Sequence, residues 1–274
     1  MNRFRCLSLA LAVALVGCGN AGSIKAEVVA HPDKRGAVVE YFMKRPGGDG
    51  PWPTIVFLHG HQPPLSRRGG AAFVKWGVLD RFAKKGYLAI SVSLPGYGGS
   101  SGPEDFAGPF TQHAVEAVIA EVEANHLAKH GKIVIQGVSL GAVTSALIMA
   151  HNPDIAGQVL ISGLYDFPAF FSQPKSPGAA DVKASMVAQI GESDAALQSR
   201  SALRYASKIK TATLVLNGAK DDRTDPVQAQ RFAAAIKANG VNARVHIFPE
   251  FGHEIPVSAR DAEIGSFIDS ILRR

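Results

Sequence analysis

After residue 52, short runs typical of buried strands alternate regularly with longer runs whose apolar residues recur at helical spacing. This alternation predicts an α/β fold with a mostly parallel central sheet and helices on both of its faces. Residues 28–30 and 37–44 are expected to add antiparallel edge strands at the front. The expected strands are 54–58, 88–94, 132–136, 158–162, 213–217 and 243–248, and the expected helices are 71–85, 113–129, 140–150, 225–240 and 258–272.

One segment interrupts the alternation. About 50 residues separate the strands at 158–162 and 213–217, which is too long for a bare loop. Weak helical patterns cover 180–190 and 194–206, so we expect a small lid insertion over about residues 163–210. The adjacent Phe170 and Phe171 either face the substrate from this lid or fix the insertion to the core.

A candidate nucleophile lies between the expected strand 132–136 and the helix that follows it. Ser139 occupies the centre of the sequence Gly-Val-Ser-Leu-Gly, and a sharp strand-to-helix turn flanked by glycines exposes such a hydroxyl to a base. The start of the helix offers free backbone N–H groups to a developing negative charge. Ser100 also stands in a Gly-x-Ser-x-Gly sequence, but Pro103 and acidic residues follow it, which is typical of a loop.

Two later loops supply the partners that a serine nucleophile needs, a base and an acid that orients the base. Asp221, Asp222 and Asp225 follow the strand 213–217, and His253 follows the strand 243–248. The carboxyl ends of parallel strands meet at one edge of a sheet, so these side chains can converge with Ser139.

The order Ser…Asp…His resembles that of the α/β-hydrolases, and the resemblance covers nearly all of the chain after its N-terminal leader. It implies an α/β-hydrolase fold with Ser139 as nucleophile and His253, within Gly-His, as base. It also implies that the acid stands three residues after the glycine ending its strand, which is Asp221. Asp222 remains the near alternative, whereas Asp225 precedes a proline and suits the cap of a helix.

The resemblance also implies an oxyanion hole of two backbone N–H groups. One belongs to Leu140, directly after the nucleophile, and the other to His61 in the loop after the first long strand. His59 is expected to brace this loop. The pair His59 and His61 has zinc-like spacing, but no carboxylate or cysteine cluster accompanies it, so we predict no metal and no cofactor.

Segments 162–166 and 204–210 are similar to segments of the prolyl-oligopeptidase-like branch, which contains peptidases and esterases. The large peptidases of that branch carry a propeller domain for which this chain has no room. We therefore expect a serine hydrolase that cleaves a small or medium-sized carboxylic ester through an acyl-enzyme, with a serine peptidase or amidase acting on short peptides as the alternative. A non-catalytic lipoprotein that binds a ligand or partner on the same scaffold is the alternative of another class.

The N-terminus has a basic start followed by an apolar run too short to span a bilayer. Residues 15–18 resemble the lipobox of bacterial lipoproteins. This predicts a signal peptide over 1–17, lipidation of Cys18 and a hydrolase domain over 18–274, with simple secretion or an uncleaved anchor as alternatives. The protein would then be exported and lipid-anchored on the periplasmic side, and the lack of aspartate after Cys18 favours the outer membrane.

Charge and cysteine content exclude other classes. The formal net charge is +6, but the basic residues are scattered along the sequence. They form no basic stripe with interleaved aromatic residues, so the sequence does not indicate a nucleic-acid partner. The only two cysteines, Cys6 and Cys18, both stand near the N-terminus, and the predicted cleavage before Cys18 would leave one of them, so the mature chain would form no internal disulfide.

Overall fold

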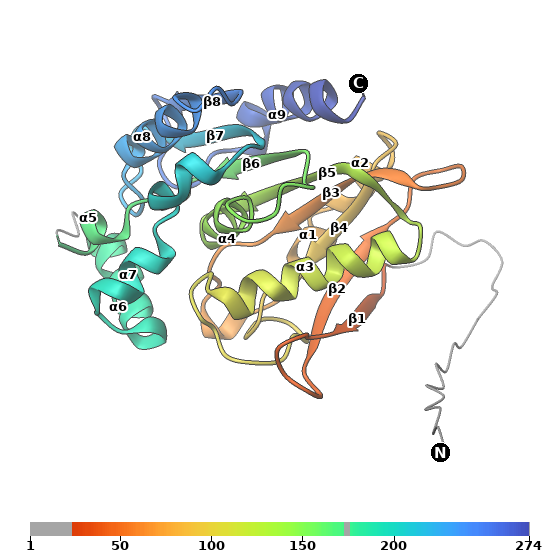
Figure 1. The fold of residues 1–274 in the computed structure, drawn as a ribbon, viewed down its shortest axis with the longest axis horizontal. Helices are drawn as coiled ribbons and strands as arrows, with labels where there is room; N and C mark the ends of the chain where they lie inside the picture. The colour runs from red at the N-terminus through yellow and green to blue at the C-terminus, as the bar shows by residue number, and fades with distance from the viewer. Residues whose placement is uncertain (1–23, 173–175, 274) are drawn as a thin grey trace, which may run out of the picture.

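The computed structural model describes residues 24–172 and 176–273. Their strands form one eight-stranded sheet in the order β1-β2-β4-β3-β5-β6-β7-β8 (Figure 1). The first two strands pair antiparallel and the other six run parallel, as the alternation predicts. The strands are β1 (Ala26–Ala30), β2 (Val38–Lys44), β3 (Trp52–Leu58), β4 (Leu88–Val92), β5 (Ala128–Val138), β6 (Gly157–Ile161), β7 (Ala212–Gly218) and β8 (Ala243–Phe248).

Helices cover both faces of the sheet. In Figure 1, α3 and α4 lie across one face, and α8 packs on the same side, whereas α1, α2 and α9 cover the other. The helices are α1 (Ala71–Lys75), α2 (Val78–Ala83), α3 (Pro109–Ala124), α4 (Leu140–Ile148), α5 (Phe167–Ser172), α6 (Pro177–Ile190), α7 (Asp194–Arg200), α8 (Pro226–Lys237) and α9 (Val257–Leu272), with 3-10 turns η1 (Pro64–Ser66) and η2 (Ala202–Lys208).

The central strands are buried on both faces, which explains their continuous apolar sequences. In β5, Ile133 and Ile135 pack in the core beneath α3 and α4, whereas Val134 packs in the core beneath α1, α2 and α9. Because side chains alternate along a strand, Gln136 and Val138 face the same side as Val134. This alternation decides which side chains reach each part of the candidate site.

Two expected helices differ from those observed by more than their last turn. The segment 71–85 is broken into α1 and α2 at Gly77, whose φ of +66° is the left-handed region that glycine enters at little cost. Helix α3 begins earlier than expected, at Pro109, because proline suits the first helical turn. It ends at Ala124, and residues 128 and 129, which were expected to be helical, belong to β5.

The insertion between β6 and β7 forms α5, α6, α7 and η2, which lie together at the left of Figure 1, beyond the α4 end of the sheet. Phe170 and Phe171 are buried within the main apolar core and do not line the candidate active-site cavity. The expectation that this aromatic pair faces the substrate is therefore wrong, and the alternative, that the pair fixes the insertion to the core, holds.

The N-terminal assignments lie outside the described residues. The predicted signal peptide over 1–17 and the lipidation of Cys18 stay predictions. Within 24–172 and 176–273, no helix combines the length and apolarity needed to cross a bilayer.

Candidate active site

Ser139 lies on a strained turn between β5 and α4. Its φ of 51° and ψ of −114° are unusual for a residue other than glycine, and they lift the side chain out of the strand. The flanking glycines allow this turn because the backbones come very close. A Cβ on Gly137 would collide with the carbonyl of Gly141, and a Cβ on Gly141 would collide with the carbonyl of Leu58 at the end of β3.

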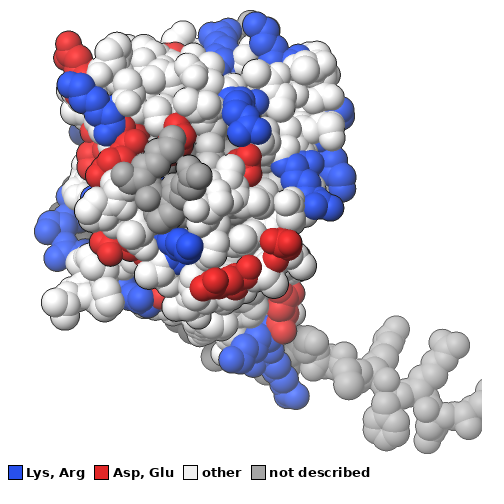
Figure 2. All heavy atoms as spheres, turned by 90° about the vertical axis from the view of Figure 1, so that its left-hand side faces the viewer, with Lys and Arg blue, Asp and Glu red and all other residues white. Residues whose placement is uncertain are grey.

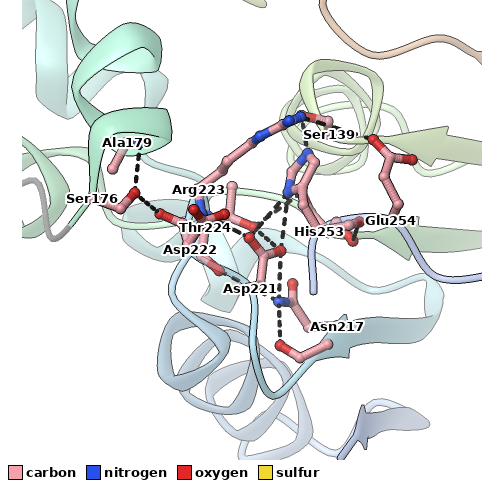
Figure 3. Close-up of polar contacts among 12 residues, drawn as sticks. Ser139, Ser176, Ala179, Asn217, Asp221, Asp222, Arg223, Thr224, His253 and Glu254 are labelled. Carbon is pink, nitrogen blue, oxygen red and sulfur yellow. Dashed lines mark hydrogen bonds and ion pairs between the residues drawn. The ribbon is translucent and has the colours of Figure 1, made fainter. Parts of the chain in front are cut away.

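The structure brings the three expected side chains into one hydrogen-bonded row (Figure 3). His253 Nε2 lies 3.2 Å from Ser139 Oγ, and His253 Nδ1 lies 3.1 and 3.0 Å from the two carboxylate oxygens of Asp221. With Nδ1 protonated and bonded to Asp221, Nε2 is left free to accept the serine proton. The row follows the carboxyl ends of β5, β7 and β8.

Asp221 is held as a carboxylate. Burial alone would raise its pKa, but the hydrogen bond and charge of His253 and the donors of Thr224 outweigh burial, so its pKa lies below the usual value. Thr224 donates through its N–H at 2.9 Å and its hydroxyl at 2.7 Å, and Asn217 Nδ2 donates at 3.1 Å. A permanent negative charge here suits the orientation of a histidine that becomes positive during a reaction.

The competing residues lie outside this hydrogen-bonded row. Asp225 caps α8 by accepting a 2.9 Å hydrogen bond from the N–H of Val227. Asp222 accepts a hydrogen bond at its backbone carbonyl from Ser176, at the start of α6 (Figure 3). Ser100 accepts a hydrogen bond from the N–H of Glu40 and does not line the cavity.

The loop after β3 presents the second expected oxyanion donor. Among the described residues, the N–H groups of His61 and Leu140 donate no hydrogen bond, so both are available to a ligand. His59 holds this loop from beneath, with Nδ1 2.8 Å from the Gly60 carbonyl and Nε2 3.1 Å from the N–H of Leu94. Both ring nitrogens of His59 are thus used, which leaves none to bind a metal ion.

A polar chain behind His61 steadies the same loop. His61 Nδ1 and Glu104 Oε2 each lie 2.9 Å from the hydroxyl of Tyr97, and Arg67 forms an ion pair with Glu104. Burial lowers the pKa of His59, to about 4, and also the pKa of His61, so the neutral form of both rings is favoured. In the described part of the chain, no group of three or more metal-ligating side chains occurs.

Several supporting residues carry no sequence signal. The hydroxyl of Ser162, itself at a φ of 52°, donates to the carbonyl of His253 at 2.8 Å. Thr224 and Asn217 would be found only by following Asp221. In Figure 3, Arg223 extends from the Asp221 loop across His253 to Glu254, with 3.8 Å between Arg223 Nη1 and Glu254 Oε1.

A cavity of about 870 Å³ opens at Ser139 and His253, and its lining residues come from both faces of the sheet. On one side lie residues of the insertion and of the core beneath α4, including Val143, Leu164 and Val182. On the other side lie residues of α1, α2 and α9, including Trp76 and Arg260. This volume can hold several residues of a peptide or a medium-sized ester.

Charge is mixed on the face that carries the insertion. Figure 2 shows Lys and Arg side chains interspersed with Asp and Glu, without an extended stripe of either sign on this face. This surface gives no indication of a polyanionic partner such as nucleic acid.

Family comparisons agree with this geometry. A model of the prolyl oligopeptidase family matches residues 109–271, and one of the X-Pro dipeptidyl-peptidases matches residues 36–173. The uncharacterised peptidase YuxL of Bacillus subtilis is 23% identical over 248 residues, which are 84% of this chain and 35% of YuxL. The chain thus spans about a third of the length of the first curated relatives it matches.

Solved structures share the fold. The acylaminoacyl peptidase of Pyrococcus horikoshii superposes with a TM-score of 0.75 at 17% identity, over 92% of this chain and 42% of that one. An esterase of Pyrococcus furiosus superposes with a TM-score of 0.70 at 18% identity, over 91% of this chain and 92% of that one. At these identities the likeness concerns the α/β-hydrolase fold.

The turn at Ser139 should tolerate no side chain at Gly137. We expect Gly137→Ala to lower the free energy of unfolding by more than about 3 kcal/mol, because backbone atoms of Gly141 must move. Urea unfolding measures this. Gly47→Ala, where a Cβ meets nothing within 4 Å, is the control and should change stability by less than about 0.5 kcal/mol. Equal effects of the two substitutions would contradict the close approach.

Buried, neutral His59 should make stability depend on pH. Its folded pKa of about 4 lies below the ordinary 6.5, so between these values the unfolded chain binds a proton that the folded chain does not. Stability contributed by His59 is therefore complete above pH 6.5 and decreases as pH falls towards 4, by at most about 1.4 kcal/mol per pH unit. Urea unfolding at pH 7 and pH 5 should show a smaller decrease for His59→Gln than for wild type. A parallel decrease would rule out this role.

Proposed function

We propose that this chain, a serine hydrolase that belongs to the prolyl oligopeptidase family, is a peptidase that hydrolyses amide bonds in short peptides. The observation that carries the proposal is that the family match spans Ser139, Asp221 and His253, and that these three side chains form one hydrogen-bonded row. Peptidases among the relatives, including YuxL, support amide substrates better than the ester substrates expected from sequence.

The proposed reaction begins with attack of Ser139 Oγ on the scissile carbonyl carbon while His253 Nε2 takes the hydroxyl proton. The carbonyl oxygen becomes an oxyanion that accepts hydrogen bonds from the N–H groups of His61 and Leu140. Asp221 balances the positive charge on His253. His253 then donates its proton to the leaving amine, the C–N bond breaks, and the acyl group remains on Ser139.

Water completes the cycle. His253 removes a proton from a water molecule that attacks the acyl-enzyme, and a second tetrahedral oxyanion forms in the same hole. Collapse of this intermediate returns the proton to Ser139 Oγ and releases a carboxylic acid. Each oxyanion donor typically contributes about 3 kcal/mol to the lowering of the barrier.

Ester hydrolysis is the second candidate. The described residues comprise one hydrolase unit with its insertion, and the Pyrococcus furiosus esterase matches this unit over nearly the whole of both chains. An ester needs less help at its leaving group than an amide does. A matched acetyl-phenylalanine ethyl ester and acetyl-phenylalanyl peptide distinguish the two: the peptidase proposal expects measurable turnover of the peptide, and turnover of the ester alone favours the esterase.

Ser139 should account for the reactivity of the site. A fluorophosphonate probe should label the wild type and leave Ser139→Ala unlabelled, because only an activated serine attacks phosphorus at useful rates. Peptide hydrolysis should fall at least about 10³-fold in the same variant. Ser100→Ala, in the other Gly-x-Ser-x-Gly sequence, is the matched control and should be labelled like the wild type. Equal labelling of wild type and Ser139→Ala would contradict the nucleophile assignment.

The acid should be Asp221 and not its neighbour. Asp221→Asn should lower kcat on the order of 10³- to 10⁴-fold, because a neutral amide neither fixes the histidine tautomer nor balances its charge. Asp222→Asn removes the same charge one residue away and should change kcat by less than about twofold. Steady-state kinetics on one peptide substrate compare the two. A larger loss in Asp222→Asn would transfer the acid role to that residue.

A further inference from the structure

The part of the cavity formed by α1, α2 and α9, here called the α9 lobe, has the features of a binding site. It is lined by Phe73, Trp76, Val78, Gln136, Val257 and Arg260. The ion pair between Arg81 and Asp261, at 2.6 Å, lies along its wall and ties α2 to α9. This ion pair therefore holds two of the helices that line the lobe in a fixed relation to each other.

Gln136 lies at the floor of the α9 lobe without a partner. Its side chain is only 7% exposed, and its Oε1 is buried without a hydrogen bond. Its side-chain amide forms no hydrogen bond with any described residue, although it lines the cavity. A buried amide without partners is costly, and rotation about its last bond can present either its carbonyl or its NH₂ to a ligand. A ligand with a peptide group would satisfy it.

Arg260 supplies positive charge to the lobe. Its Nε donates to the carbonyl of Ile255 at 3.0 Å, which fixes the guanidinium, and within the described residues no carboxylate lies in ion-pair range of it. Asp261 and Glu254 are close enough to influence Arg260 through space but pair with Arg81 and Arg223 instead. The guanidinium therefore keeps donors for an incoming anion.

The rim of the α9 lobe is apolar and exposed. Trp76, which directly follows α1, is 68% exposed, and Val257, the first residue of α9, is 43% exposed, although both side chains are large and apolar. Trp76 contacts Phe73 edge to face, which fixes the orientation of the indole. Such a rim favours a ligand with an apolar side chain between the reacting carbonyl and the charged end.

The reaction determines which part of a substrate reaches the lobe. The leaving group must lie beside His253, because His253 donates the proton that releases it. The chain runs from His253 directly through Glu254 and Val257 to Arg260, and all four residues line the same cavity. The group on the far side of the scissile bond therefore lies next to the α9 lobe, whereas the insertion and the core beneath α4 remain for the acyl part.

We propose that the α9 lobe binds the leaving group of the substrate and selects one that ends in a free carboxylate, as the C-terminal end of a short peptide does. Arg260 binds the carboxylate, Gln136 hydrogen-bonds the peptide group before it, and Trp76 and Val257 contact its apolar side chain. The inference rests on the proposed acyl-transfer function and adds a substrate class to it: short peptides shortened from their C-terminal end.

The first experiment measures occupancy of the lobe without turnover. The rate at which a fluorophosphonate labels Ser139 is followed with increasing concentrations of the dipeptide Leu-Gly or of Leu-Gly amide. The free carboxylate should slow labelling at roughly tenfold lower concentration than the amide, the factor that one charge-assisted hydrogen bond commonly contributes. Equal protection by the two compounds, or protection by neither, overturns the inference.

The second experiment assigns the effect to Arg260. Acetyl-Ala-Phe-Leu-Gly and its C-terminal amide are compared by kcat/KM, and the preference for the free acid should fall from about tenfold to near one in Arg260→Gln, mainly through KM. Arg260→Lys should restore part of the preference, because it restores the charge. Arg244→Gln, an exposed arginine on β8, is the matched control and should keep the wild-type preference in both experiments.

The outcomes separate the inference from the function beneath it. If the wild type is labelled at Ser139 but the free acid and the amide give equal protection and equal kcat/KM, the inference about the α9 lobe is wrong and the proposed function stands. A preference that survives in Arg260→Gln also contradicts the inference, even if Arg260→Gln is less stable, because the ratio compares two substrates on one variant. Failure of the wild type to be labelled contradicts the proposed function, and the inference with it.

Discussion

The active site depends on one close backbone contact, where the end of β5, the start of α4 and the end of β3 meet. Gly137 and Gly141 lack side chains at the two positions where a Cβ would strike a carbonyl, and Gly60 approaches Ser139 so closely that its Cβ would lie 3.1 Å from that of the serine. This contact positions three things together: the serine hydroxyl, the free N–H at the start of α4, and the loop after β3. Packing around the end of the sheet therefore maintains the strained backbone conformation of Ser139.

Much of the fold could be predicted from sequence because burial on both faces leaves a strong pattern. The parallel strands read as continuous apolar runs, and their order along the chain fixes where their carboxyl ends meet. The break between α1 and α2 could not be predicted, since Gly77 stands within a run of apolar residues at helical spacing. Whether Phe170 faces the core or the pocket could not be predicted either, because an aromatic residue suits both.

In the candidate site, too, some residues could be predicted from the sequence and others could not. Ser139 and His253 have short local signatures that reflect tight turns, so both can be predicted from the sequence. In the structure, His253 Nε2 lies 3.2 Å from Ser139 Oγ. Asp221 differs from Asp222 only in geometry, and the choice came from the family resemblance. Residues that act through distant contacts leave no local pattern. Ser162 holds the backbone of a histidine 91 residues away, and nothing near it in the sequence points to that contact.

Two departures from a regular α/β fold form the α9 lobe: the break between α1 and α2, and a polar residue on β5. The break at Gly77 leaves Trp76 exposed just after α1 and starts α2 at Val78, and both side chains line the space beside β5. The strand alternation that buries Val134 turns Gln136 towards the same space, where an apolar residue would have completed the core. A chain selected only for stability would favour an apolar side chain there, because an unpaired buried amide is costly. Its position on the strand that ends at the nucleophile is explained if the amide is satisfied by a substrate.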